Sequence, residues 1–300
     1  MTQGVPTAII DSYNYNNTQI TGTSGGNPTL KEETADTFSV GAVWSPHFEQ
    51  PLFRRVSASI DYYNIDIKDA VGTVIAATAL SKCFNADGSN PTYSNANFFC
   101  SLAQRDPNTG NYVASTQTNA NLGEYKTAGI DFQADWNFGL GAVGLDDSYG
   151  SLGLNVIGTY LTEFKVQLLP GDPFKSLRGT IGDTTISSTG VAYAKWKFFT
   201  TLSYDLGPFN AALRWRYVDK MQDKSCIGSA TCTAISPSAV NYFDLTGGWK
   251  INDNYEVSAG VNNLTDKQPP FFTSFTQANT DPSTYDVLGR RYFVGIKARF

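Results

Sequence analysis

Five basic residues lie in segments where apolar and polar residues alternate, and they share the polar positions of that pattern. Period-two alternation places successive side chains on opposite faces of a strand. Cations gathered on one face can hold an anionic ligand, or they can pair with the carboxylates of Asp131, Asp135, Asp205 and Asp244. The pattern alone leaves both interpretations open. The candidate ligand contacts are Lys195, Lys197, Arg214, Arg216 and Arg291.

The four cysteines form two close pairs inside polar, loop-like sequence. The spacing predicts two local disulfides, Cys83 with Cys100 and Cys226 with Cys232, and therefore an oxidising compartment. His47 is the one histidine of the chain, so neither pair has the partners of a metal site. We expect neither a bound metal nor a cofactor.

Catalysis is not indicated by the remaining residues. Nucleophilic catalysis needs a nucleophile beside a base, and His47 has only Glu49 at a useful spacing. The chain has no Gly-x-Ser-x-Gly, phosphate-binding or zinc motif. Its net charge of −5 argues against nucleic acid, which binds to basic surfaces. We therefore predict a protein that is neither an enzyme nor a nucleic-acid binder.

Nine strand-like segments position these residues. In each segment, apolar residues recur at every second position. The last one, GRRYFVGIKARF, shows the alternation most clearly. The segments span about 35–44, 54–67, 123–138, 149–166, 191–205, 208–221, 239–250, 254–263 and 289–300.

Composition favours a membrane barrel over a soluble sheet protein. Charged residues make up 16% of the chain, below the roughly 25% of soluble domains, and aromatic residues make up 13%. No run approaches the roughly 18 apolar residues of a spanning helix. Barrel strands need one apolar face, with aromatics at the membrane interfaces. We expect Asp131, Asp135, Lys195 and Arg214 on the concave face, and outward-pointing side chains for Trp136, Phe138, Trp196, Phe198, Trp215 and Tyr217.

The links between segments alternate between short and long. The long ones cover about 68–122, 167–190, 222–238 and 264–288. Outer-membrane barrels have short periplasmic turns and long outer loops, whereas a soluble sandwich has no reason to keep all long loops at one end. We therefore predict an all-β fold, an antiparallel meander of about nine transmembrane strands. Both cysteine pairs then fall in extracellular loops, where a disulfide limits loop entropy.

The same topology sets the domain boundaries. We expect residues 1–34 to form an extracellular loop segment and residues 35–300 to form barrel strands. Nine strands depart from the even number usual in bacterial barrels, and the N-terminal residues lack the features of a signal peptide. The chain is therefore expected to be a fragment of a longer protein. Six aromatic residues of the long links could line an outer vestibule or pack within their loops: Tyr93, Phe98, Phe99, Phe271, Phe272 and Phe275.

Several stretches resemble those of TonB-dependent outer-membrane receptors. NPTLKEETADTFSVGAVWSP (27–46) and SASIDYYNIDIKDAV (57–71) are similar to consecutive family strands. NLGEYKTAGIDFQADW (121–136) resembles another strand. VNNLTDKQPP (261–270), followed by GRRYFVGIKARF, is similar to the C-terminal signature of the family.

The resemblance implies the C-terminal part of a 22-stranded outer-membrane barrel, whose lumen is plugged by an N-terminal domain. It also implies a Gram-negative outer membrane, an inner-membrane TonB complex as partner, and active uptake of a scarce nutrient. A ferric siderophore is the most common substrate class. The plug would lie outside this sequence, so we expect no energised transport by this chain alone, and the basic residues could also pair with that plug.

The resemblance further implies an assembly signal read by the barrel-assembly machinery. It would consist of Tyr292, Val294, Ile296 and Phe300. Other interpretations stay open at this point: a receptor for carbohydrates or other small organic ligands, a passive channel, a surface-binding barrel, or a soluble β-domain.

Overall fold

The structure of the chain is a computed structural model. It describes residues 7–14, 20–86, 88, 90–106, 108–167, 172–182, 191–272 and 279–299. Phe275 and Phe300, which the sequence singles out, lie outside the described residues. None of the described helices is long and apolar enough to cross a membrane.

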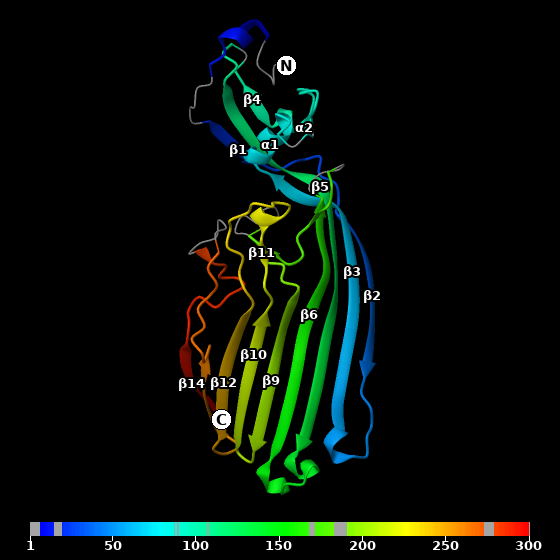
Figure 1. Cartoon of the computed structure of the whole chain (residues 1–300), viewed down its shortest axis with the longest axis vertical. Helices are drawn as coiled ribbons and strands as arrows, with labels where there is room; N and C mark the ends of the chain where they lie inside the picture. Colours follow the sequence, from blue (N-terminus) through cyan, green and yellow to red (C-terminus); the bar gives the residue numbers. More distant parts are fainter. Residues whose placement is uncertain are drawn as a thin grey trace. The chain divides into compact units, whose positions relative to one another are not determined.

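One large sheet dominates the fold and confirms the predicted nine-stranded antiparallel meander (Figure 1). Its strands follow one another in space in the order β14-β13-β12-β10-β9-β6-β5-β3-β2. Their bounds are β2 Thr34–Trp44, β3 Arg55–Val74, β5 Tyr112–Gly139, β6 Ser151–Gln167, β9 Trp196–Leu206, β10 Phe209–Val218, β12 Val240–Lys250, β13 Tyr255–Asn262 and β14 Arg291–Ala298.

The four short links join these strands at one end of the sheet (Figure 1). Two of them contain short 3-10 helices, at Pro51–Phe53 and at Leu140–Val143 with Asp147–Tyr149. The turn between β9 and β10 consists of Gly207 and Pro208. Gly207 has a φ of 55°, which tight two-residue hairpins require and glycine adopts without strain.

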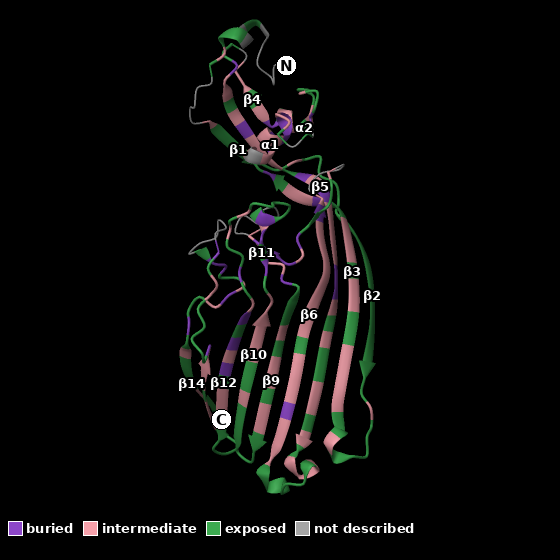
Figure 2. Ribbon diagram, viewed as in Figure 1, coloured by how far each residue is buried: buried purple, intermediate pink, exposed green. Residues whose placement is uncertain are grey.

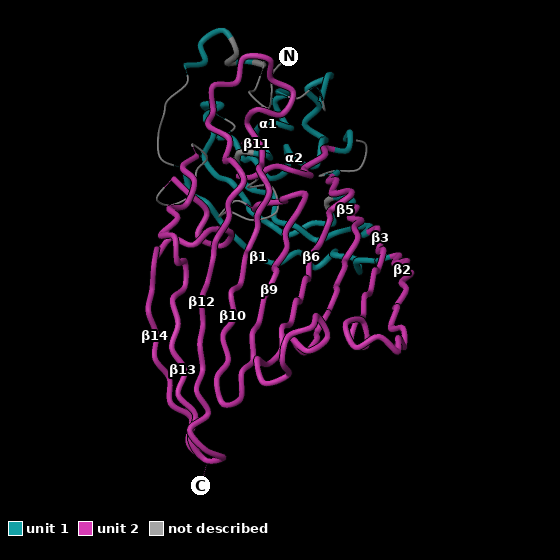
Figure 3. Tube along the Cα trace, turned by 60° about the horizontal axis from the view of Figure 1, so that its bottom comes forward, with its two compact units in different colours: residues 1–35, 67–125, 167–174 teal, residues 36–66, 126–166, 175–300 magenta. Residues whose placement is uncertain are grey.

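The chain forms two compact units, shown in two colours in Figure 3. Unit 1 contains residues 1–35, 67–125 and 167–174. It holds the helices α1 (Ala76–Cys83) and α2 (Phe98–Ser101), the 3-10 helix Thr7–Ser12, and the strands β1 (Thr21–Gly25) and β4 (Ala103–Arg105). β1 pairs in parallel with β5, and β4 pairs antiparallel with it. Val74, Ala79, Leu102 and Ala120 form a small buried core.

The sequence prediction of the strand ends is wrong in unit 1. β3 continues to Val74 and β5 begins at Tyr112, whereas the sequence indicated 54–67 and 123–138. In the stretch ASTQTNANLG (114–123), small and polar residues dominate and even positions carry only Ala, Thr and one Leu, so the period-two alternation is faint. Pairing with β1 and β4 forms the strand there, because partner strands satisfy its backbone groups.

Unit 2 contains residues 36–66, 126–166 and 175–300. Besides the main strands it has β7 (Lys175–Ser176), which pairs with β6, and a two-stranded parallel sheet of β8 (Thr180–Ile181) and β11 (Gln222–Asp223). The 3-10 helix Lys224–Cys226 follows β11. These short elements belong to the long links after β6 and β10.

Register separates two faces of the unit 2 sheet. Leu154, Leu202, Leu213, Leu245, Val261 and Tyr292 pair in one row that crosses six strands. We call the face that carries this row the apolar face. The next row on the opposite, polar face contains Asn155, Thr201, Arg214 and Asp244. The predicted alternation therefore holds from strand to strand. Exposed and half-buried residues intermix along the strands (Figure 2).

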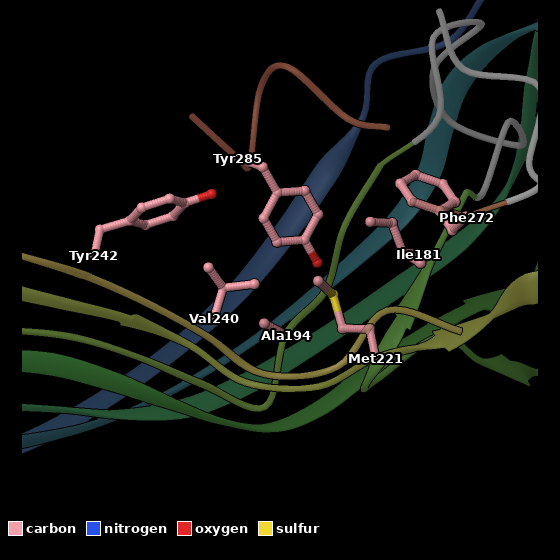
Figure 4. Close-up of a cluster of buried hydrophobic side chains, with 7 residues drawn as sticks. All are labelled: Ile181, Ala194, Met221, Val240, Tyr242, Phe272 and Tyr285. Atoms are coloured by element: carbon pink, nitrogen blue, oxygen red, sulfur yellow. The ribbon is translucent and has the colours of Figure 1, made fainter. Parts of the chain in front are cut away.

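A hydrophobic cluster covers one end of the polar face (Figure 4). Val240 and Tyr242 of β12 supply the sheet side of it, and their neighbours come from the long links. Burial is nearly complete for Tyr242 and Phe272, at 1% and 0% exposed. The cluster comprises Ile181, Ala194, Met221, Val240, Tyr242, Phe272 and Tyr285.

Candidate functional site

Strand register places four of the five predicted basic residues on the polar face. Val218 pairs with Lys197, and Arg216 and Arg214 lie two and four positions before Val218 on β10. Arg291 opens β14 opposite Asn262. Lys195 is exposed and lies just before β9, so it is not part of that strand.

Arg216 is bound by a carboxylate of the neighbouring strand. Its Nε donates to Asp244 Oδ2 at 2.8 Å, and its Nη2 donates to Asp244 Oδ1 at 3.1 Å. The guanidinium carbon also lies 4.8 Å from the centre of the Tyr242 ring, a cation–π geometry. The Asp244 side chain is 10% exposed, so this pair is largely shielded from solvent. Of the two interpretations that the sequence leaves open for Arg216, the structure therefore shows pairing with the carboxylate of Asp244.

Asp286 joins Arg216 to Arg291. Both Nη groups of Arg291 donate to the Asp286 carboxylate at 3.1 Å, and Arg216 Nη2 lies 3.6 Å from Asp286 Oδ2. The backbone N–H of Asp286 donates to Tyr242 Oη at 3.1 Å. The Asp286 side chain is only 4% exposed. We call Arg216, Asp244, Asp286 and Arg291 the charge cluster.

The two C-terminal motifs meet beside this cluster. The backbone N–H of Asn263, a fully buried residue with a φ of 53°, donates to Asp244 Oδ1 at 2.8 Å. Asp266 Oδ1 accepts the backbone N–H of Arg290 at 2.9 Å. A Cβ on Gly289 would lie 2.9 Å from that Asp266 oxygen, so glycine permits the approach. The motif around Asn263 thus fixes the start of β14.

Asp286, Asp266 and Asp281 are site residues that sequence reasoning missed. All three fall in the link between β13 and β14, where the sequence has no periodicity that assigns a face. Asp281 is 4% exposed, and its Oδ2 has no hydrogen-bond partner in the described part of the chain. Burial and the nearby Asp281 carboxylate raise the pKa of the Tyr285 hydroxyl well above its usual value.

Carboxylates on β5 are held by polar side chains of the adjoining strand. Asp131 accepts from Thr159 Oγ1 at 2.6 Å, and Asp135 accepts from Asn155 Nδ2 at 2.7 Å. A hollow of about 520 Å³ opens beside Asp131 and Thr159, with Lys197 and Phe199 on its β9 side. It presents acceptors, a cation and an aromatic ring together.

The apolar face carries the aromatic residues predicted to point outward. Phe198 stacks on Tyr217 with ring centres 4.7 Å apart, and Phe209 stacks on Trp249 at 5.9 Å. Phe209 and Tyr217 lie at opposite ends of β10, roughly 26 Å apart at 3.3 Å per residue. Because barrel strands tilt by about 35–45°, this length covers about 20 Å of the apolar band of about 25 Å that membrane barrels present.

The predicted assembly-signal residues continue this face on β14. Tyr292, Val294 and Ile296 are 73%, 75% and 75% exposed. They pair with Val261, Ala259 and Val257. Their recognition by assembly machinery stays a prediction.

Both predicted disulfides are confirmed, Cys83–Cys100 in unit 1 and Cys226–Cys232 in unit 2. The first closes the α1–α2 segment, beside the ion pair of the buried Lys82 with Asp172 at 2.8 Å. Of the loop aromatics, Phe99 packs on the unit 1 core and Phe272 is buried, whereas Phe98 and Phe271 are exposed. His47 is exposed. Among the described residues, no group of three or more His, Cys, Asp or Glu could hold a metal ion.

Comparison with known proteins identifies the sheet. A family model described as TonB dependent receptor-like, beta-barrel, matches residues 3–264. The chain belongs to the TonB-dependent receptor family. No curated protein sequence matches it significantly. Barrels of this family lie in the outer membrane of Gram-negative bacteria, and the family is one of receptors and transporters rather than enzymes.

Solved structures show the same fold. The chain is similar to the ferric enterobactin receptor of Pseudomonas aeruginosa, with 16% identity and a TM-score of 0.56 over 93% of this chain. Corresponding values are 18%, 0.53 and 92% for the siderophore receptor PirA of Acinetobacter baumannii. They are 14%, 0.55 and 93% for the FrpB iron transporter of Neisseria meningitidis. In each case the match covers 33% of the other chain. This chain therefore spans about a third of the length of these relatives.

Proposed function

We propose that this chain is the C-terminal barrel portion of an outer-membrane receptor that takes up a ferric siderophore by active transport in a Gram-negative bacterium. The observation that carries the proposal is the family match over residues 3–264 on a sheet with one apolar and one polar face. The structural relatives support the substrate class, because they include siderophore receptors and an iron transporter.

The polar face supports an anionic ligand. Lys197 and Arg214 are exposed cations of this face, and charge-assisted hydrogen bonds to such groups are among the stronger polar contacts. Arg216 and Arg291 already bind carboxylates of the chain itself. We therefore assign first contact with the ligand to Lys195, Lys197 and Arg214.

The partners follow from the family. We propose that a plug domain encoded elsewhere in the receptor fills the lumen and contacts the TonB complex. The apolar face contacts outer-membrane lipid, and Tyr292, Val294, Ile296 and Phe300 form the signal for the barrel-assembly machinery. In this topology residues 1–34 and the disulfide-bearing links lie outside the cell, and the short turns lie in the periplasm.

Growth on single nutrients tests the proposal. A strain that lacks the receptor gene is supplied with one ferric siderophore at a time as iron source, with and without a plasmid copy of the complete receptor. The expected result is growth on at least one chelate that requires both the plasmid and TonB. Growth restored only on a carbohydrate would reject the substrate class, and rescue without TonB would indicate a passive channel.

A further inference from the structure

The charge cluster combines three groups from strands with one from an irregular segment. Arg216, Asp244 and Arg291 lie on β10, β12 and β14, whereas Asp286 belongs to the link before β14. The two guanidiniums and two carboxylates balance in charge only because Asp286 supplies the second carboxylate. Without it, the strands alone would present one net positive charge at this end of the polar face.

The contacts of Asp286 are those that an arginine makes with a bound oxyanion. Arg291 donates to both oxygens of the carboxylate at 3.1 Å, one from each Nη group. Such paired hydrogen bonds are the geometry by which arginine recognises carboxylates and phosphates. Arg216 adds a second cation at 3.6 Å. A carboxylate, sulfate or phosphate group of a ligand could make the same contacts in place of Asp286.

The same segment brings a second acid to the basic residues of the polar face. Asp281 lies within electrostatic range of Lys197. Its Oδ1 accepts from the backbone N–H and hydroxyl of Ser283, whereas Oδ2 is buried without a partner in the described part of the chain. The segment around Asp281 and Asp286 thus carries negative charge to three cations of the polar face, Lys197, Arg216 and Arg291.

We propose that Asp286 is an internal substitute for an oxyanion and that the strands hold an anion-binding site at Arg216 and Arg291. This inference rests on the proposed function for its ligand class, because a ligand with carboxylate or other oxyanion groups would exchange with Asp286. Exchange would release the segment 279–290 from β10 and β14. While Asp286 occupies the site, an added anion cannot bind there. The apparent affinity for that anion is therefore the intrinsic affinity multiplied by the fraction of molecules in which Asp286 has left the site.

Anion binding to the complete receptor, purified in detergent, tests this exchange. Sulfate is titrated calorimetrically into the parent protein, Asp286→Asn and the double variant Asp286→Asn/Arg291→Gln. Asp253→Asn is the matched control, since Asp253 is 97% exposed in the turn after β12. We expect sulfate to bind Asp286→Asn at least about tenfold more tightly than the parent, because the site no longer has an internal competitor.

The double variant should lose that gain, and the control should equal the parent. No gain in Asp286→Asn, or a gain that survives Arg291→Gln, would overturn the proposal. If Asp286→Asn fails to fold, amide hydrogen exchange on the parent decides. Saturating sulfate should speed exchange within residues 279–290, and unchanged exchange would overturn the proposal. Sulfate binding is measured without transport, so absent siderophore uptake would reject the proposed function and leave the anion site standing.

Discussion

The guanidinium of Arg216 donates two hydrogen bonds to the carboxylate of Asp244, its diagonal neighbour on the adjoining strand. Asp244 in turn accepts the backbone N–H of Asn263, which begins the link to the last strand. One carboxylate therefore joins β10 to the end of β13. The pair shows that Arg216, which the sequence marks only by its charge, also holds neighbouring strands together.

Replacing Asp244 by asparagine should destabilise the barrel. The change leaves Arg216 in a half-buried position with a neutral partner, at a cost of about 2 kcal/mol. Urea unfolding of the complete receptor in detergent measures the difference. Asp253→Asn changes an exposed carboxylate and should leave the midpoint unchanged. Equal midpoints for Asp244→Asn and the parent would contradict a stabilising role for the pair.

Charge introduced on the apolar face should block assembly. Leu213→Arg places a guanidinium toward lipid near the middle of β10, which costs about 2–4 kcal/mol at the bilayer centre. Thr201→Arg is the matched control, because Thr201 pairs with Arg214 on the polar face. We expect less folded receptor in outer membranes for Leu213→Arg only. Similar loss in both variants would mean that the two faces do not differ in environment.

The larger disulfide loop should contribute more to stability than the smaller one. The bonds close separations of 17 and 6 residues. In the chain-entropy model these correspond to about 3 and about 2 kcal/mol. Cys83→Ser/Cys100→Ser should therefore expose its segment to protease at a lower urea concentration than Cys226→Ser/Cys232→Ser does. The reverse order would show that packing, not loop closure, dominates.

The ion pair of Lys82 and Asp172 should show strong coupling. Lys82 is buried, and its Nζ donates to both carboxylate oxygens of Asp172 at 2.8 Å. Asp172→Asn alone leaves a buried ammonium poorly compensated and should cost about 3 kcal/mol. Adding Lys82→Met should recover part of that loss. Proteolysis of unit 1 at increasing urea measures the stability of the parent, of each single variant and of the double variant. Strictly additive effects of the two substitutions would reject the coupling.

The Tyr285 hydroxyl should make the receptor less stable in alkali. Its pKa is raised by burial and by Asp281, so the folded protein keeps a proton that the unfolded chain releases. The contribution of Tyr285 to folding stability is fully present below the ordinary tyrosine pKa. It is lost as the pH rises through the pKa of Tyr285 in the folded protein. Tyr285→Phe should remove that part of the pH dependence between about pH 10 and 12. An unchanged alkaline slope in Tyr285→Phe would exclude Tyr285 as its source.

Periodicity predicts the faces of the unit 2 strands, and it fails where the alternation is faint. Alternation alone places Leu213 and Arg214 on opposite faces, and register confirms both. The extension of β5 before residue 123 is missed because its small and polar residues make the alternation faint. Asp286 could not be found in this way, because its place beside Arg291 depends on the tertiary path of an irregular link.

Cysteine scanning along β10 in intact outer membranes tests the central claim most directly. Each residue from Phe209 to Val218 is replaced in turn by cysteine in a receptor whose native cysteines, including the four of this chain, are replaced by serine. Each new cysteine is labelled with an environment-sensitive probe. Probes at Phe209, Ala211, Leu213, Trp215 and Tyr217 should be quenched by lipid-soluble quenchers, and probes at the alternate positions should not. Uniform quenching, or quenching of the even-numbered positions, would contradict a membrane barrel with this register.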